Sequence, residues 1–305
     1  MKGYDIKKYP DRTSYAIMTN PFHPEITVRI NTYEDLMHLK QICDAWKYSI
    51  TGSIVPTITI PCLLDAQADD RFKEGSSFGL KLVLEVLGTC DAVFNIFHPH
   101  NPQAVKLGLE LLGKRVHIYD NSEFIRKALA TLDKPKNYSL DGGFTDPSIF
   151  ENLVWLTPDA GAYKWVNKTA DNIGWKGEVW SASKVRTYED GKTKLKQQLP
   201  TQDFGGKDVL IIDDLSIYGG TFKGLSKLLD QANVGKKYLA VSHMTIQQLG
   251  ELSPSRNSRP VTDFFDKVFT TNSKHSDYHT MVWNEKTGED FIKPDNLEII
   301  KLFDE

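Results

Sequence analysis

The segment KDVLIIDDLSIYGGTFKGLSKLL (residues 207–229) carries the strongest chemical signal in the sequence. An apolar run ends in two adjacent carboxylates, Asp213 and Asp214, and a Gly-Gly-Thr turn (219–221) then opens an amphipathic stretch. Glycines let backbone N–H groups point into a loop, and a helix N-terminus adds partial positive charge, so such a loop can hold a phosphate. Paired carboxylates accept hydrogen bonds from vicinal hydroxyls. The pattern predicts a site for a ribose phosphate, whereas the competing interpretation is a strand end with solvated acids and a turn.

The elements that must position these groups follow a regular alternation of short apolar runs and longer amphipathic stretches. This order is typical of parallel sheets covered by helices, and its occurrence twice predicts two α/β domains. The polar, turn-rich segment 137–148 predicts the boundary, so that residues 1–142 form the N-terminal domain and residues 143–305 the C-terminal domain. The expected strands are 26–30, 53–64, 91–97, 115–120, 152–158, 178–183, 207–214, 236–244 and 267–272, and the expected helices are 33–49, 78–89, 104–113, 161–174 and 220–235.

Composition excludes several classes of protein. The 305 residues are 40% hydrophobic and 25% charged, which is typical of a globular chain. The formal net charge of −3 offers no overall positive field for nucleic acid. No apolar run reaches transmembrane length and the N-terminus lacks the apolar core of a signal peptide, so we expect a cytoplasmic protein. Three cysteines without C-x-x-C spacing, Cys43, Cys62 and Cys90, are expected to be buried apolar residues.

The acidic pair and its Gly-Thr turn resemble the phosphoribosyl-diphosphate motif of type I phosphoribosyltransferases and of ribose-phosphate diphosphokinases (PRPP synthetases). Further segments are similar to the diphosphokinases alone, in one order from about residue 20 to 275. These segments are FHPEITVRI (22–30), IPCLLDAQADDR (60–71), FGLKLV (78–83), TPDAG (157–161), SKVRT (183–187) and YLAVSH (238–243). The resemblance implies two phosphoribosyltransferase-like domains, each with a mainly parallel sheet covered by helices.

The activity that this resemblance implies is transfer of the β,γ-diphosphate of MgATP to the anomeric hydroxyl of a ribose phosphate, with release of AMP. It implies ATP as co-substrate, Mg²⁺ as cofactor, small-molecule substrates only, and a homo-oligomer, with no nucleic-acid or membrane partner. The implied catalytic residues are Lys184 and Arg186; the ribose and phosphate residues are Asp213, Asp214, Ser216, Tyr218, Gly219, Gly220 and Thr221; the ATP residues are Phe22, Glu25, Gln67, Asp69 and His98; and the metal residues are His98 and Asp159.

Each of these assignments competes with a simpler interpretation. Lys184 and Arg186 lie in a charged stretch that is also typical of a solvated surface loop. Phe22 and Glu25 are equally consistent with a strand-edge pair, and an Asp beside Pro and Gly, as at Asp159, is an ordinary turn residue. His98 is flanked by Pro99 and a second histidine, which predicts an exposed loop.

The sequence departs from the family pattern at three places. Gln67 and Ala68 replace an Arg-Gln pair, Ile96 replaces an Asp, and Ile217 and Tyr218 replace an Asp-Thr pair in the phosphate loop. A loop with Ile and Tyr offers fewer hydrogen-bond donors to a terminal phosphate and more surface for stacking. This change favours an extended acceptor, ADP-ribose foremost, as in the phage enzymes that make ADP-ribose pyrophosphate for NAD synthesis; such an enzyme would act in the host cytoplasm.

Three alternatives stay open. The chain can be a PRPP synthetase that uses ribose 5-phosphate, with the loop changed by drift. It can be a catalytically silent regulator built on the same fold. It can also be a phosphoribosyltransferase that consumes the product, although a one-domain transferase would match only the second half of the chain.

Overall fold

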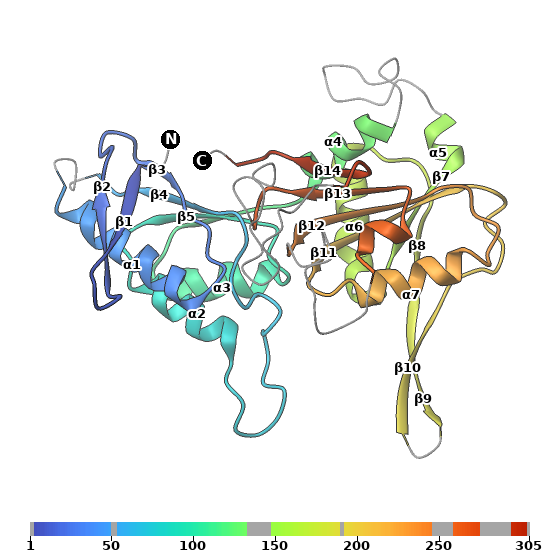
Figure 1. The fold of residues 1–305 in the computed structure, drawn as a ribbon, viewed down its shortest axis with the longest axis horizontal. Helices are drawn as coiled ribbons and strands as arrows, with labels where there is room; N and C mark the ends of the chain where they lie inside the picture. Colours follow the sequence, from blue (N-terminus) through green and yellow to red (C-terminus); the bar gives the residue numbers. More distant parts are fainter. Residues whose placement is uncertain are drawn as a thin grey trace. The chain divides into compact units, whose positions relative to one another are not determined.

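The computed structural model describes residues 3–49, 54–132, 148–189, 192–245, 259–274 and 294–303. The chain divides into two compact units, drawn in Figure 1. The first comprises residues 1–120 with 273–276 and 302–305, and the second comprises residues 121–272 with 277–301. Among the described residues, no helix combines the length and apolar character needed to cross a membrane.

The first unit contains a four-stranded parallel sheet in the order β3-β4-β5-β6 and a separate antiparallel pair, β1-β2. Helices connect the parallel strands, as parallel pairing requires. The elements are β1 (Tyr4–Lys8), β2 (Ser14–Met18), β3 (Glu25–Thr27), α1 (Tyr33–Lys47), β4 (Thr57–Ile60), α2 (Gly79–Gly88), β5 (Val93–Phe97), α3 (Pro102–Leu111) and β6 (Val116–Tyr119).

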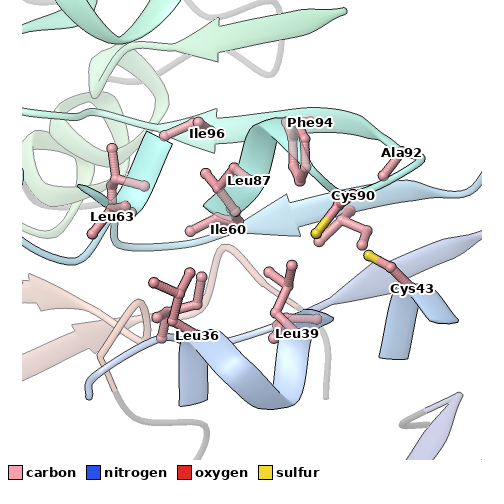
Figure 2. Packing of buried hydrophobic residues seen from close by; sticks show 14 of the residues in the cluster. Leu36, Leu39, Cys43, Ile60, Leu63, Leu87, Cys90, Ala92, Phe94 and Ile96 are labelled. Carbon is pink, nitrogen blue, oxygen red and sulfur yellow. The ribbon is translucent and has the colours of Figure 1, made fainter. Parts of the chain in front are cut away.

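Helix α1 begins at a capping box, in which Thr32 and Asp35 bond each other's backbone N–H groups. Its apolar face includes Leu36 and Leu39, which pack toward Ile60 on β4 and Leu87 on α2 (Figure 2). This spacing places the apolar residues of α1 on one stripe, and that stripe joins the sheet in a single core.

The three cysteines are buried and unpaired by disulfides, which confirms their expected character. Cys43 and Cys90 lie at one end of the first core with their sulfur atoms turned toward each other (Figure 2). A hydrogen bond between the two thiols raises the pKa of Cys43 and lowers that of Cys90.

The second unit contains a six-stranded parallel sheet in the order β14-β13-β12-β11-β7-β8. A separate antiparallel ribbon, β9-β10, extends away from this sheet (Figure 1). The elements are α4 (Ser122–Leu132), α5 (Ser148–Asn152), β7 (Leu153–Thr157), α6 (Ala160–Ile173), β8 (Val179–Ser181), β9 (Ser183–Glu189), β10 (Lys192–Gln198), β11 (Asp208–Ser216), α7 (Gly220–Leu229), β12 (Lys237–Met244), the 3₁₀ helix η2 (Val261–Phe264), β13 (Lys267–Thr271) and β14 (Leu297–Ile300).

Strand β11 is buried on both faces, so its sequence is a continuous apolar run instead of an alternating one. Val209 and Ile211 share a core cluster with Phe222 and Leu225 of α7. Helix α6 packs against β7, β8 and β11, and α4 packs against α6. The strand therefore holds its carboxyl end rigidly between packed layers.

The sequence predictions of strand and helix order are confirmed for both units, and so is the fold class. Six features were missed: the β1-β2 pair, helix α4, helix α5, the strand character of residues 183–198, the 3₁₀ helix η2 and strand β14. The SKVRT segment was expected to be a loop, and this expectation is wrong because it forms β9, whose Val185, Thr187 and Tyr188 are of types that favour strands.

The predicted domain boundary at residues 142 and 143 lies outside the described residues. Helix α4, which that boundary places in the first domain, belongs to the second compact unit. Thr169 on α6 donates a hydrogen bond to the Asn121 side chain over 2.7 Å, and Asn172 bonds Ser122 over 3.4 Å. These bonds hold the start of α4 on α6.

We expect Leu39→Ala to destabilise the first unit by ~2–5 kcal/mol, because it deletes buried methyl groups and leaves a cavity. Leu39 is fully buried at 0% exposure. Urea unfolding followed by a probe in the first unit measures the change. Leu107→Ala is the matched control, since Leu107 on α3 is 58% exposed and its loss should change stability by less than ~0.5 kcal/mol. Equal effects of the two substitutions would contradict the assigned core.

Candidate active site

The carboxyl ends of β7, β8 and β11 meet at one edge of the second sheet, because these strands are parallel and adjacent. Ligands in open α/β sheets bind at this edge. Asp159 follows β7, Lys184 follows β8, and Asp213 and Asp214 lie at the end of β11. The fold therefore gathers four of the predicted site residues at one edge of one unit.

Asp213 and Asp214 form the electrostatic centre of this edge. Asp214 is 4% exposed, and its backbone N–H donates to Asp213 Oδ1 over 3.0 Å. Burial, the neighbouring Asp214 charge and the more distant Asp159 charge raise the pKa of Asp213 well above its usual range. A ligand that donates hydrogen bonds or brings positive charge would relieve this strain.

The loop between β11 and α7 turns at Gly219, which adopts a left-handed conformation at φ +66°. Other residues adopt this conformation at a cost, so glycine suits the position directly before α7. Thr245 after β12 fixes the loop, since its N–H donates to Ser216 O over 3.1 Å and its Oγ1 to Ile217 O over 2.8 Å. The backbone N–H groups at the start of α7, at Gly220 and Thr221, follow directly after this loop, and N–H groups at a helix N-terminus can bind a phosphate.

The side chains of this loop differ sharply in exposure. Ser216 is buried at 1% exposure, whereas Ile217 is 40% exposed and Tyr218 is 64% exposed. Within the described part of the chain, the Ser216 Oγ atom has no hydrogen-bond partner. The loop thus presents apolar and aromatic surface to solvent directly beside the acidic pair.

Asp159 is the N-cap of α6, and its side chain accepts from the N–H groups of Gly161 at 3.0 Å and Ala162 at 3.3 Å. The Lys184 Nζ donates to Asp159 Oδ2 over 2.7 Å. Burial alone would raise the pKa of Asp159, but the hydrogen bond and charge of Lys184, together with the helix N–H groups, outweigh it and lower the pKa. The ion pair holds a cation at this edge of the sheet.

Arg186 lies two residues further along β9, in cross-strand register with Leu195. Its backbone belongs to the ribbon, while its side chain lies outside the described residues. The predicted role of Arg186 therefore stays a prediction.

A pocket of about 380 Å³ opens beside β8, the outermost strand of the sheet next to β7. Its lining includes the aromatic side chains of Tyr163, in the first turns of α6, and Trp180 on β8, together with Val179, Ser181, Pro200 and Thr201. The pocket therefore offers aromatic surface next to the outer strand of this sheet.

Three of the predicted ATP residues, Gln67, Asp69 and His98, lie in the first unit, where the loops after β4 and β5 meet. Asn101, the N-cap of α3, donates from Nδ2 to Asp69 Oδ2 over 3.0 Å and accepts from Ala104 N over 3.1 Å. Asn101 was missed in the sequence, although an Asn-Pro pair before an apolar stretch is a helix-start signal. Gln67 is exposed on the same loop as Asp69.

The expectation that His98 lies in an exposed loop is wrong. His98 is 5% exposed, and its backbone N–H continues the sheet by donating to Tyr119 O over 2.7 Å. Its φ of +39° is unusual for a non-glycine residue, and such conformations cluster at functional sites. Ile96, two residues earlier, is a fully buried core residue of β5.

Phe22 and Glu25 do not share an edge of the sheet with Asp69 and His98. Glu25 begins β3, so it lies at the amino edge, whereas the loops after β4 and β5 lie at the carboxyl edge. Both side chains are exposed, Phe22 to 70%. The first unit by itself therefore does not join these residues into one ATP site.

The side chains near the predicted metal residues decide whether a metal ion could bind there. Among the described residues, no three His, Cys, Asp or Glu side chains gather closely enough to hold an ion alone. Asp159 and Asp213 carry carboxylate oxygens at the same edge of the sheet, and this donor type suits a hard cation such as Mg²⁺. Mg²⁺ is commonly held by one or two carboxylates plus substrate phosphates, and this donor set fits that mode.

Comparison with known proteins gives one consistent family. No protein-family model matches the chain. It is 27% identical over 226 residues to the ribose-phosphate pyrophosphokinase of Sulfurisphaera tokodaii, covering 70% of this chain and 67% of the relative. It is 24% identical to that of Pyrococcus abyssi over 243 residues, covering 78% and 75%. The phosphoribosylpyrophosphate synthetase from Mycobacterium smegmatis superposes with a TM-score of 0.67 at 16% identity, covering 99% and 87%, which shows the shared fold.

We expect Asp213→Asn to raise the Tm of the ligand-free protein at pH 7. Because its pKa is raised in the folded state, the ionised Asp213 carboxylate lowers the free energy of unfolding. This loss of stability is complete above the raised pKa and absent below the ordinary carboxyl pKa of about 3.9. The gain in Tm should therefore shrink as the pH falls toward about 4. Differential scanning calorimetry across this range measures it.

Asp159→Asn is the matched control with the opposite sign. The pKa of Asp159 is lowered, so its carboxylate stabilises the fold above the ordinary carboxyl pKa and that contribution is lost as the pH falls through the lowered value. This substitution should lower Tm at pH 7. A loss of stability in Asp213→Asn comparable to that in Asp159→Asn would contradict the electrostatic account.

Proposed function

We propose that this chain, which belongs to the ribose-phosphate pyrophosphokinase family, transfers a diphosphate group from ATP to a ribose-phosphate acceptor. In the proposed reaction the anomeric hydroxyl oxygen attacks the β-phosphorus of ATP. The bond from that phosphorus to the bridging oxygen of the α-phosphate breaks, and AMP leaves with that oxygen. The hydroxyl proton is released, so atoms and charge balance without any oxidant or reductant.

One observation carries the proposal: the acidic pair, the N-terminus of α7 and the Lys184–Asp159 ion pair lie at one edge of one sheet. Asp213 and Asp214 would accept from the ribose hydroxyls, and the N–H groups at Gly220 and Thr221 would bind the acceptor phosphate. Lys184 would bind the oxygens of the transferred diphosphate, where negative charge concentrates. Arg186 is proposed as a second cation on the same strand.

Magnesium ion is proposed as the cofactor, held by ATP phosphates with Asp159 and Asp213 as protein ligands. When bound, it would neutralise charge on the transferred diphosphate. His98, in the first unit, stays a predicted contact of the metal and the nucleotide, and Asp69 is proposed to contact the nucleotide, with Gln67, Phe22 and Glu25 as further ATP contacts. A homo-oligomer stays a prediction.

ADP-ribose is proposed as the acceptor in preference to ribose 5-phosphate. The support is the exposure of Ile217 and Tyr218 in the loop between β11 and α7. A phosphate monoester needs several donors around its terminal oxygens, whereas a diester continues into a second group that can pack on aromatic rings. ADP-ribose carries such a group, its adenosine.

A catalytically silent regulator of the same fold remains a second candidate. The observation that favours it is Ile96, which fills the core at a position where the family has an acid. Incubation with MgATP and either acceptor separates the two candidates, because only an enzyme releases AMP in step with acceptor consumption.

Lys184→Ala and Arg186→Ala should each lower kcat by about 100-fold or more, since each removes a cation that acts on developing charge. AMP release under saturating MgATP and acceptor is the measurement. Lys168→Ala is the matched control, because Lys168 is an exposed cation on α6 far along the helix from its N-terminus. If both variants retained turnover within about threefold of wild type, the catalytic assignment would be wrong.

The acceptor prediction is tested by restoring the family residues. Ile217→Asp with Tyr218→Thr should shift the ratio of kcat/KM from ADP-ribose toward ribose 5-phosphate by about tenfold or more, since stacking of a base contributes ~1–3 kcal/mol. Both acceptors are compared in both proteins. A wild type that uses ribose 5-phosphate efficiently and ignores ADP-ribose would identify an ordinary PRPP synthetase.

A further inference from the structure

The base of the β9-β10 ribbon is attached to the first turn of α7 by Gln197. This residue lies outside all the segments that resemble the family. Gln197 on β10 donates from Nε2 to the Thr221 backbone carbonyl, 3.1 Å away in the first turn of α7. In the ribbon, Gln197 lies directly opposite Lys184. Because directly opposed residues of an antiparallel pair point to the same face, Lys184 and Gln197 project together from the ribbon.

The two side chains reach two different loops of the same unit. Lys184 bonds Asp159 in the loop after β7, and Gln197 bonds Thr221 after β11. Strands β7 and β11 are neighbours in the sheet. The ribbon base is thus held at two points across the proposed diphosphate and acceptor sites.

Helix α7 is shaped to receive the Gln197 amide. A Cβ atom at Gly224 would overlap Gln197 Oε1, and nothing else lies within 4 Å of it apart from the Gln197 Cδ. Gly224 is inside α7, where glycine is otherwise unfavourable compared with alanine. The glycine therefore costs helix stability and leaves room for this one contact.

We propose that Gln197 is a positioning residue that anchors the ribbon to α7 and so sets where Lys184 meets the transferred diphosphate. This inference rests on the proposed function. The Lys184–Asp159 ion pair must loosen when phosphate oxygens take over the ammonium, so it cannot fix the ribbon during the reaction. The Gln197–Thr221 bond involves no group that contacts the diphosphate, and it remains in place throughout.

Two substitutions remove the anchor in independent ways. Gln197→Ala deletes the amide, and Gly224→Ala displaces it while leaving Gln197 in the chain. We expect each to lower kcat by about tenfold to 100-fold with KM for ATP and acceptor changed less, because misplacement of a catalytic group by about 1 Å costs that much. Gly224→Ala should at the same time raise Tm, since alanine favours the helix.

Double variants locate the effect. Gln197→Ala/Gly224→Ala should be no slower than either single variant, and Lys184→Ala/Gln197→Ala no slower than Lys184→Ala, because residues that act through one group are not additive. Gln198→Ala, which removes the exposed neighbour opposite Ser183, is the control and should match wild type.

Amide hydrogen exchange of residues 183–189 and 192–198 supplies a readout that does not need activity. Gln197→Ala and Gly224→Ala should speed exchange in the ribbon by about tenfold while α6 is unchanged. Unchanged exchange in the ribbon would overturn the anchor itself. Faster exchange with wild-type kcat would overturn its positioning role, and faster exchange in a protein that releases no AMP at all would confirm the anchor and refute the proposed reaction.

Discussion

The constraint on which the second unit depends is the presence of two adjacent carboxylates at the packed end of β11. Removing ionised groups from water costs several kcal/mol each, and like charges on consecutive residues add to that cost. The raised pKa of Asp213 is the signature of this cost. A strand buried on both faces, with α7 on one side and α6 on the other, is rigid enough to hold the pair in place. The fold gives up stability there to keep two carboxylates at the end of β11.

Positive charge is supplied around this pair by backbone and side chain together. Helices α6 and α7 both begin at this edge, so each places unpaired N–H groups and the positive end of its dipole there. At α6, the Asp159 carboxylate accepts hydrogen bonds from two of those N–H groups. The same carboxylate also accepts a hydrogen bond from the Lys184 ammonium. The start of α7 has no side-chain cap, because Gly219 is its N-cap residue. The uncapped N-terminus of α7 is therefore the proposed anion site, whereas the Asp159 cap of α6 positions the Lys184 ammonium.

The sequence predicted this arrangement where local signals were strong, and failed where the positions depend on distant contacts. The buried apolar run of β11, its acidic end and the Gly-Gly-Thr turn are contiguous, so a candidate acceptor site could be predicted directly from the sequence. Residues 183–198 were not recognised as a ribbon because their polar, lysine-rich sequence lacks the alternating apolar face of a strand. His98 was misjudged because its burial follows from the Tyr119 carbonyl and the sheet edge, and neither is visible in the residues around it. Gln197 and Asn101 act through carbonyl and carboxylate groups that lie 24 and 32 residues away.

In the proposed reaction, the loop between β11 and α7 would allow the acceptor to change while the chemistry is kept. The groups proposed to meet the reacting ribose, Asp213 and Asp214, sit on the rigid strand, whereas Ile217 and Tyr218 sit beyond it and are exposed. Thr245 holds the loop by bonds to the carbonyls of Ser216 and Ile217, so the backbone path does not depend on which side chains residues 217 and 218 carry. Substitutions at these two positions can therefore alter what lies at the far end of the acceptor without moving the anomeric hydroxyl. Ile217 and Tyr218, which are proposed to contact a second ring system of the acceptor, are therefore compatible with an unchanged diphosphate transfer to the anomeric hydroxyl at the other end of the same ribose.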